Sequence, residues 1–118
     1  MPGRNIYPRA ERLTRKSEYR FVFENGEKLV GRHFICYLVR GEGKESKLGF
    51  AVSRKVGNAV TRNRVKRHIR EFYRTRRRGF TEPVTMVVVA RWSSAGLSCP
   101  ESAAAITRLL ERGGIWHG

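Results

Sequence analysis

The pattern of apolar and polar positions is clearest between residues 48 and 78 of the chain. A short apolar run, LGFAV, is typical of a strand, and a basic loop that contains Gly57 follows it. Further on, apolar side chains recur at the spacing of one helix face. These positions are Val65, Ile69, Phe72 and Tyr73. The segment therefore predicts a strand, a loop and an amphipathic helix, which Asn58 or Thr61 would cap and Gly79 would end.

The opposite side of this predicted helix is strongly cationic. Four cations fall within about 100° of one another on the helical wheel. They are Lys66, Arg67, Arg70 and Arg74. Between Arg54 and Arg78 the chain has eleven of its 25 lysine and arginine residues and a single acid, Glu71. A solvated surface helix is the usual explanation of a charge run, but solvated faces mostly mix signs, so this one favours a polyanionic partner.

Two more helices are predicted. Residues 16–25 indicate a short helix, with Ser17 as its cap and Gly26 at its end. The side chains that share one of its faces are Tyr19, Val22 and Phe23. Residues 101–112 indicate a last helix. Its apolar stripe is Ala105, Ile106, Leu109 and Leu110.

Three segments predict strands. Residues 29–40 are strand-like, and their apolar side chains alternate between two faces. One face has Phe34, Cys36 and Leu38, and the other has Ile35, Tyr37 and Val39. We expect residues 41–46 to form a hairpin connection to a paired strand at residues 47–53. Residues 85–90 form a continuous β-branched run, which is typical of a strand buried on both faces.

A chain of 118 residues is long enough for one domain with one modest core. The order of helix, strands, basic helix, strand and helix indicates an α+β sandwich of one sheet with helices. We expect residues 1–11 to be a flexible basic arm and residues 113–118 to be a short C-terminal tail.

Charge and composition narrow the class of function. The net charge of +15 and the pI near 11.2 point to nucleic acid or an anionic membrane surface. No apolar run has the length of a membrane span, and the N-terminal sequence has no apolar core of a secretory signal, so we expect a cytoplasmic protein that binds RNA or DNA. All ten acids are glutamates without the spacing of a catalytic pair, so we expect no catalytic residue in the protein. Cys36 and Cys99 lie far apart, so free thiols and no metal site are expected.

Residues 55–71, KVGNAVTRNRVKRHIRE, resemble the signature of the protein subunit of bacterial ribonuclease P, with Arg62-Asn63-Arg64 at its core. The resemblance spans roughly Arg12 to the last helix. It implies a single-domain α/β sandwich in the order α-β-β-(β)-α-β-α, with one roughly four-stranded sheet, like the second domain of ribosomal protein S5. It also implies a left-handed βαβ crossover, whereas sequence pattern alone predicts the right-handed form found in about 98% of such units.

The resemblance also implies different roles for the RNA and the protein. In this family a large RNA is the catalyst of an endoribonuclease that removes the 5′ leader of precursor tRNA, and Mg²⁺ is required and held mainly by RNA. The protein is expected to use no organic cofactor, to supply no catalytic group, and to bind the catalytic RNA and the leader. We expect a monomer, one per RNA, that does not bind membranes.

Two sets of site residues follow from the resemblance. Arginine forks suit phosphate oxygens, and aromatic faces suit unpaired bases. The residues expected to bind the catalytic RNA are Arg54, Lys55, Arg62, Asn63, Arg64, Lys66, Arg67, Arg70 and Arg74. Those expected to bind the precursor-tRNA leader are Arg12, Tyr19, Phe23, Ile35, Tyr37 and Ser53. His68, inside the basic helix, is expected to face RNA or to lie at the boundary of that surface rather than to act as a base.

Three other functions fit part of the sequence. A structural RNA-binding protein of ribosomal type explains charge and size, but not the extended motif. A DNA-binding protein would place the basic helix in a major groove, usually as a dimer. A nuclease that acts without RNA would need acids that the fold brings together from distant positions.

Overall fold

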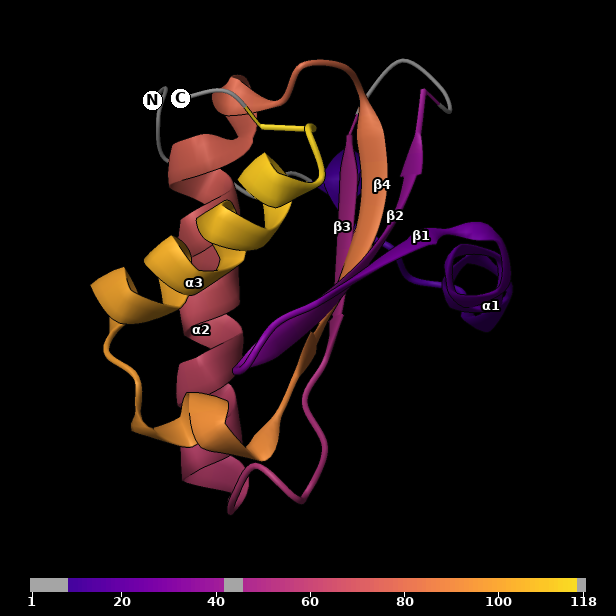
Figure 1. Cartoon of the computed structure of the whole chain (residues 1–118). Coiled ribbons are helices and arrows are strands. Elements are labelled where there is room, and N and C mark those ends of the chain that lie inside the picture. Colours follow the sequence, from indigo (N-terminus) through magenta and orange to yellow (C-terminus); the bar gives the residue numbers. More distant parts are fainter. Residues whose placement is uncertain (1–8, 42–45, 117–118) are drawn as a thin grey trace.

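The computed structural model describes residues 9–41 and 46–116 (Figure 1). Residues 1–8 of the predicted arm and residues 117–118 of the predicted tail lie outside the described residues. The elements in chain order are η1 (Arg9–Glu11, a 3₁₀ helix), α1 (Lys16–Asn25), β1 (Glu27–Val30), β2 (Phe34–Arg40), β3 (Lys47–Ala51), α2 (Ala59–Arg76), η2 (Arg77–Gly79), β4 (Val84–Ala90), η3 (Trp92–Gly96) and α3 (Cys99–Arg112).

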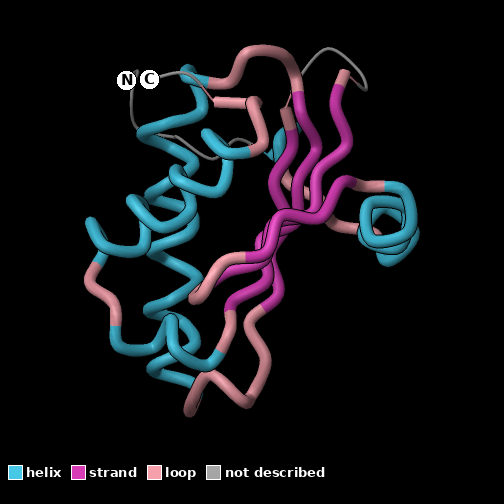
Figure 2. The backbone as a smooth tube through the Cα atoms, viewed as in Figure 1, coloured by secondary structure: helices cyan, strands magenta, loops and turns pink. Residues whose placement is uncertain are grey.

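One four-stranded sheet separates the helices into two layers (Figures 1 and 2). Helices α2 and α3 cover one face, and α1 lies on the other. The larger core lies under α2 and α3, where β2 contributes Phe34, Cys36 and Leu38. The smaller core lies under α1 and includes Val22 and Val87. The predicted sandwich and the predicted alternation along β2 are therefore confirmed.

The strand order is β1-β2-β4-β3, with β3 parallel to β4 and the other pairs antiparallel. The prediction that the strand after residues 41–46 pairs with the strand before them is wrong, because β4 lies between β2 and β3. The central place suits β4, whose sequence VTMVVVA is apolar on both faces. The single strand predicted for residues 29–40 is also wrong. The chain turns at Gly31, whose N–H donates to the carbonyl of Phe34 at 2.9 Å, and β1 pairs back onto β2.

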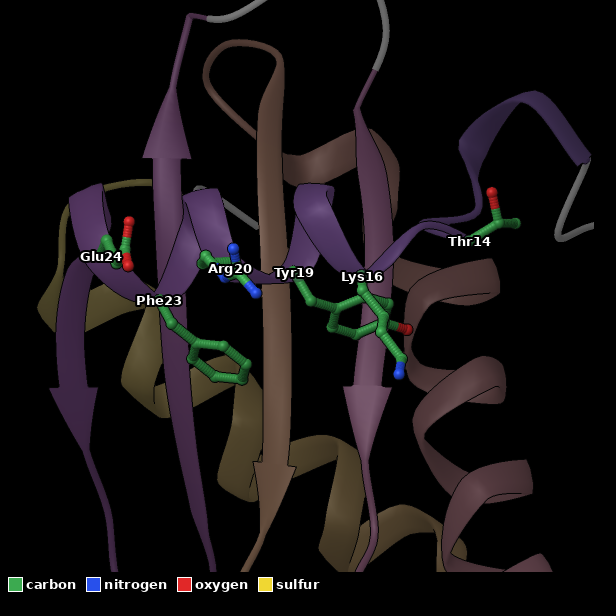
Figure 3. A pocket seen from close by; sticks show the side chains of 6 residues that line it. All are labelled: Thr14, Lys16, Tyr19, Arg20, Phe23 and Glu24. Carbon is green, nitrogen blue, oxygen red and sulfur yellow. The ribbon is translucent and has the colours of Figure 1, made fainter.

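The crossover from β3 through α2 to β4 is left-handed. Figure 3 shows the sheet from the side of α1, with β3 and β4 both running downward, β4 to the left of β3, and α2 behind the sheet. The chain therefore leaves β3, passes behind the sheet and returns on the left. This is the opposite of the hand found in about 98% of such units, and it confirms the hand that the resemblance implies.

The starts of α1 and α2 follow local capping chemistry. The Oδ1 of Asn58 accepts the N–H of Thr61 at 2.9 Å, so the predicted cap of α2 is confirmed. The predicted cap of α1, Ser17, is wrong because Ser17 lies inside the helix. Instead, Glu18 reaches back and accepts the N–H of Arg15 at 3.1 Å.

Gly49 in β3 lies directly against the ring of Tyr19 from α1. A Cβ on Gly49 would stand 2.7 Å from the Tyr19 hydroxyl oxygen. We therefore expect Gly49→Ala to displace this ring and to lower the free energy of unfolding by about 1–3 kcal/mol, as measured by urea unfolding. Gly96→Ala is the matched control, since a Cβ there would meet no described atom within 4 Å. Equal losses in the two variants would contradict this packing.

Candidate RNA interface

The cationic side of α2 faces away from the core. On its apolar side, Val65, Ile69 and Phe72 are at most 1% exposed, whereas Arg67 and Arg70 are open to solvent. The other residues expected to bind the catalytic RNA divide into two groups by exposure. Those exposed are Arg54, Lys55, Asn63 and Arg74, and those half-buried are Arg62, Arg64 and Lys66.

Two of these arginines also have partners within the protein. Arg64 donates to the carbonyl oxygen of Ala95 at 2.6 Å and so ties α2 to η3. Arg74 pairs with Glu71 one turn earlier, and the hydrogen bond between them lowers the pKa of the Glu71 carboxyl. Both side chains therefore support the fold in addition to adding positive charge.

Two further arginines on α2 differ in their surroundings. The guanidinium of Arg70 lies over the ring of Phe50, 5.3 Å from its centre, and this fixes the cationic face beside β3. The Nε of Arg62 is buried and has no hydrogen-bond partner among the described residues. A buried donor without an acceptor costs about 1–3 kcal/mol, so an acceptor on a bound partner would relieve this cost.

The loop between β3 and α2 presents Ser53, Arg54 and Lys55 to solvent. The Oγ of Ser53 accepts the N–H of Lys55 at 3.3 Å, and buried Val56 anchors the turn. Gly57 has a φ of +155°, and a Cβ there would stand 2.9 Å from a side chain in the first turn of α2. The loop therefore needs glycine at this point to enter the helix and to hold its cations outward.

The second predicted surface lies on the α1 side of the sheet. Phe23 and Tyr37 pack edge to face, with ring centres 4.8 Å apart. The hydroxyl of Tyr19 donates to the carbonyl of Leu13 at 3.5 Å, and burial raises its pKa. Beside these rings a hollow of about 460 Å³ opens (Figure 3). Its lining is Thr14, Lys16, Tyr19, Arg20, Phe23 and Glu24.

Cross-strand pairing extends this surface beyond α1. In the row next to Tyr37, Ile35 of β2 pairs with Val89 of β4, which pairs with Ala51 of β3. All three side chains in this row are half-buried. Val30 of β1, which is 47% exposed, pairs with Ile35 and continues the row. We call the hollow and this apolar row the α1 cleft.

The structure therefore brings most of the expected leader-binding residues together. Tyr19 and Phe23 line the hollow, Tyr37 packs against Phe23, and Ile35 belongs to the apolar row of the cleft. Ser53 follows the carboxyl end of β3. Arg12 lies further off, at the outer edge of β3, where it forms an isolated bridge with Leu48.

Three cations beside the cleft were not expected from the sequence. Lys16 and Arg20 line the hollow, and the Nζ of Lys28 lies 5.7 Å from the centre of the Tyr37 ring. Helical spacing could have indicated the first two, because Lys16 and Arg20 lie three residues before Tyr19 and Phe23.

Of the two positions expected for His68, on the RNA-facing surface or at its boundary, the RNA-facing one is wrong. Its side chain is buried between α2 and α3, where its Nδ1 lies 3.3 Å from the Oγ of Ser102. Burial lowers the pKa of His68, and the charges of Arg64 and Arg67 lower it further. The imidazole is therefore neutral in the folded protein at neutral pH and serves to pack the two helices together.

This lowered pKa predicts acid sensitivity of the fold. Below about pH 6.5 the unfolded chain takes up a proton at His68 more readily than the folded chain does, so this contribution to stability is lost as pH falls. We expect His68→Gln, which can keep a hydrogen bond to Ser102, to lose less stability than the wild type between pH 7.5 and pH 5. Urea unfolding at both values tests this, and identical losses would contradict it.

The fold and these two surfaces define a small basic protein of the RNA-binding class. The family model for ribonuclease P matches residues 7–114. The chain therefore belongs to the ribonuclease P protein family. It is a protein component of ribonuclease P, and its partner is a ribonuclease P RNA. The alternative of a structural RNA-binding protein of ribosomal type is not favoured.

Relatives and solved structures agree with this assignment. The chain is 34% identical to the ribonuclease P protein component of Desulfatibacillum aliphaticivorans over 110 residues, which cover 93% of each chain. It is 36% identical to that of Halalkalibacterium halodurans over 107 residues, which cover 90% of this chain and 82% of the relative. The RNase P protein from Thermotoga maritima has a TM-score of 0.77 at 26% identity, over 86% of this chain and 96% of that one. The Staphylococcus aureus RNase P protein shares the fold, with a TM-score of 0.84 at 24% identity, over 92% of this chain and 100% of that one.

Proposed function

We propose that the protein binds the catalytic RNA of ribonuclease P and the 5′ leader of precursor tRNA at the same time, and so assists removal of the leader. The main support is the way the two surfaces adjoin at β3. On one face of β3, Phe50 lies under the guanidinium of Arg70 from cationic α2. On the other face, Gly49 packs against Tyr19 and Ala51 ends the apolar row of the α1 cleft. Strand β3 alone thus separates the contact surfaces for the two RNAs.

The cationic face suits the backbone of a folded RNA. Lys66, Arg67 and Arg70 would neutralise phosphates and release counterions, which gives affinity without sequence preference. The buried Nε of Arg62 would gain an acceptor at the same time. These contacts would fix the protein on the catalytic RNA.

The α1 cleft suits a single strand. Aromatic faces such as those of Phe23 and Tyr37 stack on unpaired bases, with about 1–3 kcal/mol for each base. Lys16 and Arg20 line the hollow beside them and would contact the leader backbone. Since neither kind of contact selects a base, the holoenzyme should accept many leader sequences.

Catalysis and Mg²⁺ binding would belong mainly to the RNA. No three His, Cys, Asp or Glu residues in the described ranges are grouped so that they could hold a metal ion. Several glutamates are also already engaged within the protein. Their pairs are Glu11 with Arg77, Glu18 with Lys47, Glu27 with Arg40 and Glu71 with Arg74. This supports a protein that binds and positions RNA while the RNA performs hydrolysis.

The complex would contain one protein per RNA and would work in the cytoplasm. No helix in residues 9–41 and 46–116 is long and apolar enough to cross a membrane. Cys36 and Cys99 are free thiols, and burial raises the pKa of Cys36 to about 12. Free thiols of this kind fit a reducing compartment.

The test is cleavage of precursor tRNA at low Mg²⁺ by the protein alone, by a bacterial ribonuclease P RNA alone, and by the two together. The proposal predicts a cut at the mature 5′ end in the mixture, at a rate well above that of the RNA alone. Cleavage by the protein alone would show a catalytic site in the protein. No gain in the mixture would refute a role in leader removal.

A further inference from the structure

Trp92 is the most exposed aromatic side chain in the described part of the chain, with 72% of its surface open to solvent. It begins η3, two residues after the central strand β4 ends. An indole has a large apolar surface, and covering that surface stabilises a complex strongly. Packing within the protein does not account for a tryptophan at this position.

The backbone around Trp92 is held in place by the turn between β1 and β2. The N–H of Arg91 donates to the carbonyl of His33 at 2.9 Å. On the other side, the Oγ of Ser93 donates to the carbonyl of Arg32 at 3.1 Å and lies 2.8 Å from the Nδ1 of His33. The indole is therefore presented by a preorganised turn. Little free energy is then lost in ordering this backbone when a partner binds.

The position of η3 adjoins the cationic face of α2. Arg64, in the basic motif, donates to Ala95 of η3, and η3 lies at the end of the molecule where α2 begins (Figure 1). Val60, which is 75% exposed, lies one turn before Arg64 on the same helix. Val60 and Trp92, the two most exposed large hydrophobic side chains among the described residues, thus belong to neighbouring segments. Exposed Arg91 directly precedes the indole.

We propose that Trp92 stacks on an unpaired nucleobase of the ribonuclease P RNA, next to the phosphate contacts of α2. The inference rests on the proposed function and adds a contact to its RNA surface. Stacking on an indole suits any base, and the cations of the adjoining face of α2 suit the phosphates of the same RNA strand. The leader is a poorer candidate, because η3 contacts α2 on the face of the sheet opposite to α1.

Trp92→Ala is expected to weaken binding of the protein to a transcript of a bacterial ribonuclease P RNA by roughly 5- to 150-fold, the effect of one lost base–aromatic stack. The slope of log affinity against log salt should stay the same, because no charge is removed. The urea midpoint should also stay the same, because the indole is exposed. Trp92→Phe should keep part of the affinity. Phe21→Ala is the matched control, since it removes an aromatic side chain that is 48% exposed on α1.

Each outcome decides the inference. Unchanged RNA binding by Trp92→Ala would overturn it and leave the proposed function intact. A loss seen only with leader-bearing precursor would assign the stack to the leader and would also overturn it, as would equal losses in Trp92→Ala and Phe21→Ala. If the wild-type protein itself did not bind the transcript, the proposed function would fail before any variant was compared.

Discussion

Alanine substitution of Lys66, Arg67 and Arg70 together is expected to weaken binding of ribonuclease P RNA by roughly 100-fold at about 0.15 M salt. Each phosphate contact contributes about 0.7–0.9 to the slope of log affinity against log salt, so each loss lowers affinity about fivefold at this salt concentration. The slope of log affinity against log salt should fall by roughly 2 to 3. Filter-binding titrations at several salt concentrations measure this slope. The effect should not depend on whether the substrate has a leader.

A pair of single variants provides the matched control. Arg67→Ala and Arg108→Ala each remove one exposed arginine from a helix, but Arg108 lies on α3. Only Arg67→Ala should reduce the salt slope. Equal reductions would mean that net charge, rather than the face of α2, determines RNA binding. Arg64→Ala is less informative, because it would also release η3 from its hydrogen bond at Ala95.

Tyr37→Ala is expected to weaken binding of precursor tRNA to the holoenzyme by roughly 10-fold or more, since one lost base–aromatic stack removes about 1–3 kcal/mol. Binding of mature tRNA and of the catalytic RNA should be unchanged, because Tyr37 lies on the α1 face of the sheet. Equilibrium titrations of the assembled holoenzyme with labelled precursor and labelled mature tRNA measure both effects.

Val39→Ala is the control for Tyr37→Ala. Val39 lies on the same face of β2, two residues further along, and packs in the smaller core under α1. Its truncation should lower stability and leave the preference for leader-bearing precursor unchanged. If both variants reduced that preference equally, loss of packing under α1 would explain the result, and the cleft would not be the leader site.

Much of the local structure could be predicted because it depends on neighbouring residues. The bounds of α1 at Lys16–Asn25, the Asn58 cap of α2 and the alternation along β2 each follow from chemistry within a few positions. The cationic face of α2 followed from helical spacing in the same way. The left-handed crossover was available only through the family resemblance, since general topology rules favour the opposite hand.

The remaining features depend on partners far along the chain. His68 meets Ser102, which is 34 positions away, and Arg64 meets Ala95, which is 31 positions away. Neither spacing has a signature in the sequence. The neighbour of β3 also depends on a distant segment, because β4, which lies between β2 and β3, follows α2 in the chain. Gly31 within the apolar segment was the available signal for the turn between β1 and β2.

The most direct test of the account compares precursor tRNA with mature tRNA as ligands of the ribonuclease P RNA, with and without the protein. If the α1 cleft binds the leader while α2 binds the catalytic RNA, the protein will tighten binding of the precursor and leave that of mature tRNA almost unchanged. The extra affinity for the precursor should fall as its leader is shortened, and it should be absent without a leader. Equal tightening of both ligands, or of neither, would contradict the assignment of the two surfaces.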